Sequence, residues 1–485
     1  MNETTVVILG AGMSGICMAI KLREAGIEDL VMLEKSESPG GTWNDNTYPG
    51  ACCDVASHLY SFSFEPNPDW SRAYSEQAQI RSYFEHCVEK YGLRSSIRYG
   101  TTVVSAHYEE ETGHWLVGTA DGENLRCKFL VSGLGQLNLP NTPHFEGAES
   151  FQGESFHSAR WNHDLDLTGK RVAVIGNAAS AIQFIPPVAE QAQQVTIYQR
   201  SANYLLARND STYSEADKQR YRDHPWLQKL SRLRWFLRQE LVLFGAMLSG
   251  SLRQRLVTKV ARQYLEDEIS DPRMREQLSP DYPMGCKRVL VSDDYYQALV
   301  KHDVDLVTSL IVGIGPEGVR TQDDIEREVD IIIYGTGFRA TEFLAELDVR
   351  GRNGIALKDS WADGAEALRG IAVPGYPNLF LLYGPNTNLG HNSIIYMVEA
   401  QVKYIVQCLD KVLAHDLKSL EANERASANF NQRLQAELEK TVWGGECGSW
   451  YKNDSGKITN NWPHTATRFA FSMRSPDFTE YNMSV

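Results

Sequence analysis

The chain has 485 residues, of which 42% are hydrophobic and 23% are charged, and its formal net charge at pH 7 is −14. This length is enough for two to three domains with large cores, and the composition is ordinary for a globular enzyme. Because nucleic-acid binding requires a positive surface, the net charge argues against a nucleic-acid partner.

The start of the chain and its apolar runs show no targeting signal. The first residues, Met-Asn-Glu-Thr-Thr, lead directly into an apolar run with the pattern of a strand, so no signal peptide is expected. The most apolar later stretch, 241–248, is far shorter than the roughly 20 residues that cross a bilayer. The eight cysteines show no C-x-x-C spacing and are expected to be reduced thiols. The sequence therefore predicts a cytoplasmic protein with neither a transmembrane segment nor a metal site.

The first forty residues predict a nucleotide-binding unit. Strands are expected at 6–9 and 30–33, with a helix at 16–24 between them. Gly10, Gly12 and Gly15 follow the first strand, where they permit a tight turn, close approach of a pyrophosphate and close packing of helix on strand. Glu34 ends the second strand, 19 residues beyond Gly15, where a carboxylate accepts hydrogen bonds from an adenosine ribose. The unit suits FAD; the alternative is a glycine turn in some other α/β fold.

A second unit of the same kind begins at residue 171. Its strands are expected at 171–175 and 195–198, and Gly176 opens its turn. Arg200 stands where the first unit has its carboxylate, and a guanidinium binds a 2′-phosphate that a carboxylate would repel. The unit therefore suits NADPH over NADH, unless Arg200 is only a solvated surface arginine. Ala178 replaces a glycine of the pattern and would hold the pyrophosphate slightly further away.

The rest of the chain predicts how the units are arranged. Residues 211–275 show helical spacing and are expected to form an insertion in the second unit. Strands at 329–333 and 379–382 are expected to complete the first sheet, followed by a helix at 394–413. The glycine- and tryptophan-rich segment 443–462 is expected to be mobile and at the surface.

The fold class is therefore α/β, with two Rossmann-like domains. The FAD-binding domain is expected at 1–145 and 329–485. The NADP-binding domain, with its helical insertion, is expected at 146–328 and inserted in the first domain.

Three sequence signatures narrow the family. Residues 151–161 fit F-x-G-x-x-x-H-x-x-x-W, residues 40–54 fit [A/G]-G-x-W-x-x-x-x-[F/Y]-P-[G/M]-x-x-x-D, and residues 330–338 fit D-x-x-x-x-[A/G]-T-G-[F/Y]. In order and spacing the chain resembles the type I Baeyer–Villiger monooxygenases, FAD- and NADPH-dependent enzymes that convert ketones to esters or lactones. Asn162 departs from the proline or aspartate that usually follows the first signature. The resemblance implies that His157 lies on a linker between domains and is not an acid or base.

The resemblance also implies a catalytic pair. Gly285-Cys-Lys-Arg288 is similar to a family segment whose lysine contacts the 2′-phosphate of NADPH and whose arginine lies over the flavin. This assigns Lys287 to NADPH and Arg288 to catalysis. Asp54 matches the aspartate that holds this arginine; without the resemblance, a structural ion pair would be the simpler interpretation. Arginine suits the role because it stays charged in a dry site and stabilises an anionic peroxyflavin.

Further residues are assigned to the cofactors by their places in these motifs. Gly41, Thr42 and Trp43 resemble a segment lining the flavin, and Asn386 is expected near the isoalloxazine. Gln183 and Ser201 are expected near NADPH, and Trp450 lies in a segment that covers the nicotinamide in relatives. The full set of expected cofactor contacts is Gly10, Gly12, Met13, Ser14, Gly15, Glu34, Lys35, Gly41, Thr42, Trp43, Asp54, Tyr60, Gly176, Asn177, Ala179, Ser180, Gln183, Arg200, Ser201, Lys287, Gly337 and Asn386.

The implied reaction is hydride transfer from NADPH to FAD, formation of a C4a-peroxyflavin with O₂, and attack on a small-molecule ketone. The nearest alternative is a flavin monooxygenase of the same class that oxygenates sulfur or nitrogen. A disulfide reductase would need a spaced redox pair, which the adjacent Cys52 and Cys53 do not provide. A non-catalytic flavoprotein would have lost Arg288 or Asp54. The sequence predicts neither the particular ketone nor the oligomeric state.

Overall fold

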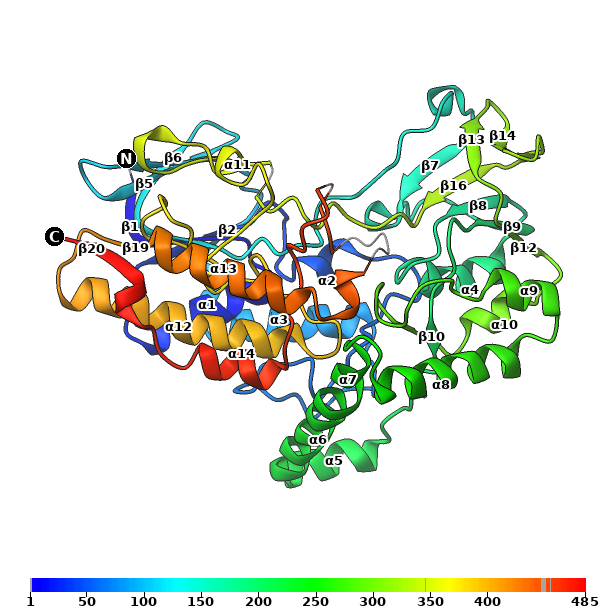
Figure 1. Ribbon diagram of the computed structural model, residues 1–485, viewed down its shortest axis with the longest axis horizontal. Helices are drawn as coiled ribbons and strands as arrows, with labels where there is room; N and C mark the ends of the chain where they lie inside the picture. Colours follow the sequence, from blue (N-terminus) through cyan, green and yellow to red (C-terminus); the bar gives the residue numbers. More distant parts are fainter. Residues whose placement is uncertain (1, 345, 446–450, 454) are drawn as a thin grey trace.

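Two sheets in separate lobes organise the computed structural model, which describes residues 2–344, 346–445, 451–453 and 455–485 (Figure 1). The first sheet has the order β17-β4-β5-β6-β1-β2-β3, and β18 also pairs with β6. Strands β6, β1, β2 and β3 are parallel neighbours, whereas β4, β5 and β6 form an antiparallel meander. The strands of this sheet are β1 (Asn2–Leu9), β2 (Leu30–Leu33), β3 (Ile97–Arg98), β4 (Val103–Glu109), β5 (His114–Thr119), β6 (Asn124–Ser132), β17 (Asp348–Arg350) and β18 (Leu379–Leu381).

The second sheet is entirely parallel, with the order β12-β9-β8-β16-β7. Its strands are β7 (Glu154–His157), β8 (Arg171–Ile175), β9 (Gln194–Tyr198), β12 (Val304–Val307) and β16 (Ile331–Tyr334). The prediction that the strand at 329–333 completes the first sheet is therefore wrong, because β16 lies between β8 and β7 of the second sheet. An NADP-binding domain ending at 328 would leave out one of the central strands of this sheet. The strand expected at 379–382, β18, does join the first sheet.

The glycine turn after β1 sets the start of helix α1 (Met13–Glu24), three residues before the predicted start. Gly10 has a φ of +90°, a conformation that side-chain-bearing residues rarely adopt. A Cβ on Gly15 would lie 2.0 Å from the carbonyl oxygen of Gly10, so only glycine lets the helix pack this closely on the turn.

The first sheet is covered by helices that share one core. The long helix α12 (Ile394–Ala414) packs on α1, with α3 (Gln77–Lys90) and α14 (Ala466–Ser472) around them. The predicted helix at 394–413 is confirmed to within one residue. In the second lobe, α4 (Ala181–Gln191) and α10 (Tyr295–Leu299) pack together beside β8 and β9.

The insertion expected at 211–275 is helical, as predicted, and most of it lies along the lower edge of the view in Figure 1. It contains α5 (Glu215–Asp223), α6 (Pro225–Arg238), a π-helical turn (Gln239–Leu243), α7 (Phe244–Ala246), α8 (Leu252–Glu268) and α9 (Pro272–Gln277). No helix in the described parts of the chain has both the length and the apolar character that crossing a membrane requires.

The remaining elements are short or peripheral. They include α2 (Thr42–Asp45), β10 (Leu205–Leu206), β11 (Leu290–Val291), β13 (Ile311–Ile314), β14 (Gly318–Thr321), β15 (Glu326–Glu328), α11 (Leu357–Ser360), β19 (Ser419–Ala422), α13 (Glu424–Leu438) and β20 (Tyr481–Ser484).

Candidate active site

A cavity of about 1160 Å³ lies at the carboxyl ends of the parallel strands of both sheets, where nucleotides bind in such folds. It is lined by both glycine turns and by the loops that carry Asp54 and Arg288. The expected site residues that line it are Gly10, Gly12, Met13, Ser14, Glu34, Lys35, Gly41, Thr42, Trp43, Asp54, Tyr60, Gly176, Asn177, Ala179, Ser180, Gln183, Arg200, Ser201, Lys287, Arg288 and Gly337. Gly15 and Asn386 are not part of the lining.

The first glycine turn offers bare backbone and a buried carboxylate to the cavity. A Cβ on Gly41 would lie 3.0 Å from the Cα of Gly12, so two backbone segments form the wall where a pyrophosphate would pass. Glu34 is 5% exposed, and its carboxylate accepts hydrogen bonds from the backbone N–H of Ala11 at 2.7 Å and of Ser36 at 2.9 Å. These bonds hold the carboxylate at the end of β2, where an adenosine ribose would meet it. The residues present therefore fit FAD.

Three side chains in contact with one another, those of Trp43, Tyr60 and Met13, continue this wall. The indole N–H of Trp43 donates to the hydroxyl of Tyr60 at 3.0 Å, and the two rings meet edge to face at 5.7 Å. The hydroxyl of Tyr60 in turn contacts the sulfur of Met13 at 3.8 Å. Burial raises the pKa of Tyr60, which therefore presents a neutral phenol.

The second glycine turn faces a pocket with two positive charges. Lys287 donates from Nζ to Oγ of Ser201 at 2.7 Å, and its ammonium lies 4.6 Å from the centre of the Tyr282 ring. Burial lowers the pKa of Lys287, and the nearby charge of Arg200 lowers it further. An anion placed between the two cations would relieve this repulsion. The pocket thus fits the 2′-phosphate of NADPH.

Arg288 and Asp54 form an ion pair at the cavity wall. Nε and Nη2 of Arg288 both donate to Oδ2 of Asp54, at 3.0 and 2.5 Å. The carboxylate of Asp54 raises the pKa of Arg288 more than burial lowers it, so the guanidinium stays charged. Tyr383 and Tyr451 are close enough for their charge state to affect Arg288, and burial raises the pKa of Tyr451 to about 12. The arginine therefore faces neutral phenols and one compensating carboxylate.

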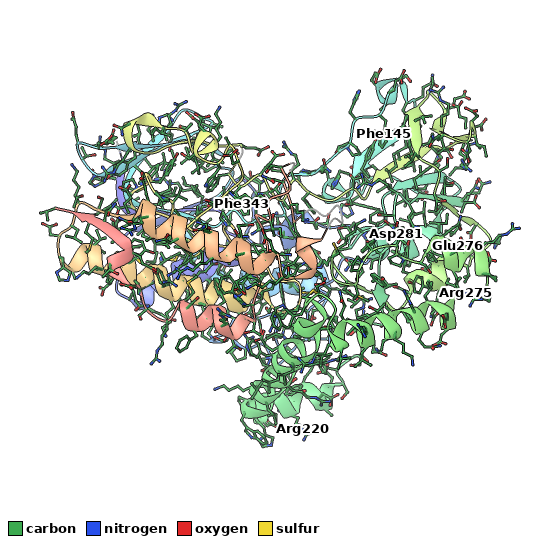
Figure 2. The ribbon with its side chains drawn as sticks, in the orientation of Figure 1. Phe145, Arg220, Arg275, Glu276, Asp281 and Phe343 are labelled. Atoms are coloured by element: carbon green, nitrogen blue, oxygen red, sulfur yellow. The ribbon has the colours of Figure 1, made fainter. Side chains whose placement is uncertain are left out.

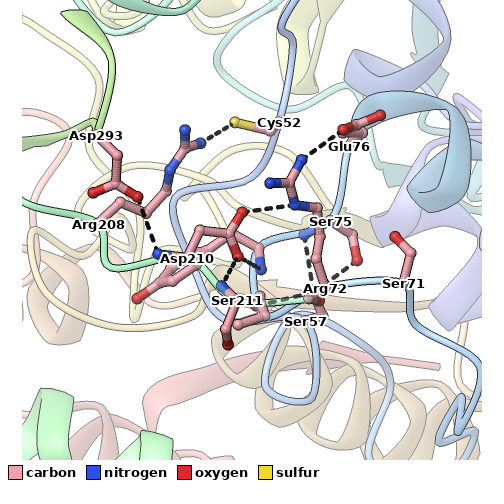
Figure 3. Close-up of polar contacts among 12 residues, drawn as sticks. Cys52, Ser57, Ser71, Arg72, Ser75, Glu76, Arg208, Asp210, Ser211 and Asp293 are labelled. Atoms are coloured by element: carbon pink, nitrogen blue, oxygen red, sulfur yellow. Dashed lines mark hydrogen bonds and ion pairs between the residues drawn. The ribbon is translucent and has the colours of Figure 1, made fainter. Parts of the chain in front are cut away.

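The loop that carries Asp54 is attached to the second lobe on two sides. Gln183 of α4 accepts from the hydroxyl of Tyr48 at 3.0 Å and donates to the carbonyl of Cys52 at 3.1 Å. Figure 3 shows the other side, where Arg208 donates to the sulfur of Cys52 and Arg72 pairs with Asp210 at 2.7 Å. The side-chain amide of Gln183, expected to contact NADPH, is thus engaged in holding this loop.

A buried carboxylate that the sequence analysis did not single out holds another part of the cavity wall. Glu240, in the π-helical turn, accepts from His391 at 3.2 Å and from Asn392 at 3.0 Å. It also accepts from the backbone N–H groups of Ala466 and Thr467, the first turn of α14. Asn392 lines the cavity, so Glu240 ties the insertion to the wall of the site. In the sequence, this role could have been suspected because Glu240 is the only acidic residue in an apolar stretch.

Three expectations do not match the structure. Asn386 is 3% exposed and donates to the carbonyls of Ile458 and Asn461, away from the cavity lining. In the segment 443–462, Trp443, Tyr451 and Trp462 are buried, whereas Gly444, Gly445, Ser455 and Gly456 are exposed, so only part of the described segment lies at the surface. Cys286 is disulfide-bonded and not a reduced thiol. Trp450 lies outside the described residues.

Comparisons with known proteins agree with this geometry. A family model described as flavin-binding monooxygenase-like matches residues 3–356. A Baeyer–Villiger monooxygenase of Pseudomonas aeruginosa is 41% identical over 481 residues, which cover 99% of this chain and 91% of the relative. Another from Streptomyces coelicolor is 40% identical over 485 residues, with 99% and 93% coverage.

Solved structures extend the comparison to the whole fold. A steroid monooxygenase bound to NADP superposes with a TM-score of 0.88 at 30% identity, covering 100% of both chains. A closed form of cyclohexanone monooxygenase has a TM-score of 0.89 at 25% identity, covering 100% of this chain and 99% of the other. The chain therefore belongs to the flavin-binding monooxygenase-like family.

Proposed function

We propose that this protein is an FAD-containing, NADPH-dependent Baeyer–Villiger monooxygenase that uses O₂ to convert a ketone to an ester or lactone. The observation that carries the proposal is the Asp54–Arg288 pair, placed at a cavity that both glycine turns share. The relatives with this activity in their names, similar over nearly the whole chain, support it. The small-molecule ketone and the cytoplasmic location expected from the sequence are parts of the same proposal.

A carboxylate would contact one cofactor, and positively charged side chains would contact the other. The turn at Gly10–Gly15 and the carboxylate of Glu34 would hold FAD, and Arg200, Ser201 and Lys287 would hold the 2′-phosphate of NADPH. When bound, FAD supplies the redox chemistry, taking up hydride from NADPH and activating O₂.

Arg288 supplies a fixed positive charge beside the reacting oxygen, because its guanidinium does not lose its proton even when buried. That charge stabilises the negative charge that develops as oxygen adds to the carbonyl carbon of the ketone. Asp54 orients the guanidinium. The neutral phenol of Tyr451 leaves the charge of Arg288 available, because it adds no second anion near the guanidinium.

The proposal is tested by supplying the FAD-loaded protein with NADPH, ¹⁸O₂ and a panel of cyclic, linear and aryl ketones. We expect an ester or lactone that contains one ¹⁸O atom, with one NADPH consumed for each product. Sulfide and amine substrates run beside the ketones. Oxygenation of sulfides or amines with no ketone converted would contradict the proposal and support the sulfur- or nitrogen-oxygenating alternative.

The phosphate pocket predicts a preference for NADPH that Arg200→Ala weakens. A charge-assisted hydrogen bond contributes about 1.5–3 kcal/mol, so the Kd for NADPH should rise by about 10- to 100-fold while that for NADH hardly changes. Titration of both nucleotides by protein fluorescence gives the two constants. Arg320→Ala is the matched control, since Arg320 is exposed on β14 outside the cavity. An equal loss of affinity for both nucleotides would show that Arg200 does not contact the phosphate.

A further inference from the structure

Helix α6 carries a row of apolar side chains that are exposed to solvent. Along α6 and the π-helical turn, apolar residues recur at intervals of three or four and form one stripe. The exposed fractions are 61% for Trp226, 54% for Leu230, 50% for Leu233, 43% for Leu237 and 57% for Leu241. Such a stripe is usually the buried face of a helix, so its exposure calls for a partner.

The opposite face of α6 is firmly attached. Arg232 donates to the carbonyls of His58, Leu59 and Ser61, and Gln228 donates to the carbonyl of Asn67. The ring of Phe236 packs on Tyr396 with centroids 4.8 Å apart. These contacts fix the rotation of the helix, so the leucine stripe cannot turn inward without breaking them.

Helix α8 repeats the arrangement on the same edge of the molecule. Leu252, Leu256 and Val260, spaced by four residues, are exposed by 75%, 63% and 60%. Val257 and Ala261 form its buried side. Both helices lie along the lower edge in Figure 1, and Figure 2 places Arg220 of α5 at the same edge.

The charge of this segment is opposite to that of the chain. From the start of α6 to the end of α8, residues 225–268 contain eight lysines and arginines and four acidic residues, for a net charge of +4 in a chain of −14. The acidic residues are the buried Glu240 and the three that end α8, Glu266, Asp267 and Glu268. Lys229, Arg234 and Arg238 flank the leucine stripe and are exposed. We call the exposed apolar residues of α6 and α8, with these basic residues, the basic leucine edge.

We propose that the basic leucine edge docks the protein on the surface of an anionic lipid bilayer. Leucine and tryptophan on one helix face, bordered by lysine and arginine, suit the boundary between headgroups and acyl chains. The anionic headgroups attract the edge and repel the negative remainder of the chain, which fixes the orientation. A symmetric contact between two copies would instead place two such positive surfaces against each other.

The test uses the FAD-loaded full-length protein and vesicle flotation at low and high salt. We expect binding to vesicles of phosphatidylcholine with phosphatidylglycerol, weak binding to phosphatidylcholine alone, and release by salt. The double variant Lys229→Gln/Arg234→Gln should lower the partition coefficient by about 25-fold, since each charge contributes about fivefold. Leu233→Ser/Leu237→Ser should lower it by at least about tenfold. Quenching of Trp226 fluorescence by brominated lipid, absent in Trp226→Phe, reports its insertion.

Matched controls lie elsewhere on the surface. Ile355 is 51% exposed and Arg320 is exposed, so Ile355→Ser and Arg320→Gln should bind vesicles as the wild type does. Equal binding to neutral and anionic vesicles, or unchanged binding of the edge variants, would overturn the proposal. A dimer in light scattering that Leu233→Ser/Leu237→Ser dissociates, with no vesicle binding, would assign the edge to a second copy. The readouts do not depend on the enzymatic activity.

Discussion

Replacing Arg288 with alanine is expected to lower ester or lactone formation by at least about 100- to 1000-fold, the usual cost of removing a group that stabilises a developing oxyanion. NADPH oxidation should continue, because Lys287 and Arg200, which would hold the 2′-phosphate of NADPH, are unchanged. The electrons of NADPH would still reduce O₂, but no oxygen atom would be inserted into the ketone, so hydrogen peroxide should replace the ester as the product. Product analysis together with a peroxide assay measures both quantities in one reaction.

Two further variants separate the charge of Arg288 from its position. Arg288→Lys keeps a cation that can lose its proton in a dry site, so it should recover only part of the activity and only at lower pH. Asp54→Asn removes the carboxylate that both Nε and Nη2 contact, so it should lower ester formation while the arginine remains. The control is Arg320→Ala, exposed on β14 outside the cavity lining, which should leave ester formation unchanged. If Arg288→Ala converts ketones at the wild-type rate, the proposed mechanism is wrong.

The parts of the fold that the sequence predicts well are those set by local rules. The turn at Gly10, the helix that follows it and the strand that ends at Glu34 depend on contacts within about 30 residues. Helix α12 is long and strongly periodic, and its predicted bounds differ from the observed ones by one residue. The cavity residues follow because the carboxyl ends of parallel strands must meet at one edge of a sheet.

The sheet that a strand joins depends on contacts between residues far apart in sequence. The prediction for the strand at 329–333 was wrong for this reason. The apolar run of β16 is buried on both sides and would fit the parallel part of the first sheet as well as the second sheet. Only its pairing with β7 and β8, which are more than 150 residues away in sequence, decides the question. Asn386 illustrates the same limit: its motif places it near the flavin, whereas its amide is used to hold Ile458 and Asn461.

The insertion shows a different limit. Helical periodicity finds α6 and α8, but it does not say whether the leucine face is buried or exposed. That outcome depends on the three carbonyls that Arg232 meets on the facing loop, which no pattern in α6 records. The role of Glu240 depends likewise on residues 391, 392, 466 and 467, which only the fold brings to it.

Replacing Glu240 with glutamine is expected to destabilise the protein by about 3 kcal/mol at pH 7. Burial raises the pKa of Glu240, but hydrogen bonds from His391, Asn392 and the backbone of α14 lower it more, to about 2. A shift from 4.5 to about 2 corresponds to roughly 3 kcal/mol of stability. The amide of glutamine carries no charge and would turn an NH₂ group toward donors that need an acceptor.

The same shift predicts how the effect depends on pH. Because the pKa in the folded protein lies below the unfolded value near 4.5, the contribution of Glu240 is complete above pH 4.5 and is lost as the pH falls toward 2. The difference in unfolding free energy between wild type and Glu240→Gln should therefore shrink between pH 5 and pH 3. Denaturant unfolding of the FAD-loaded proteins at several pH values measures it, with Glu266→Gln, exposed on α8, as the control. A difference that does not change with pH would mean that glutamine acts through its shape alone, and that the carboxylate charge does not hold the insertion to the cavity wall.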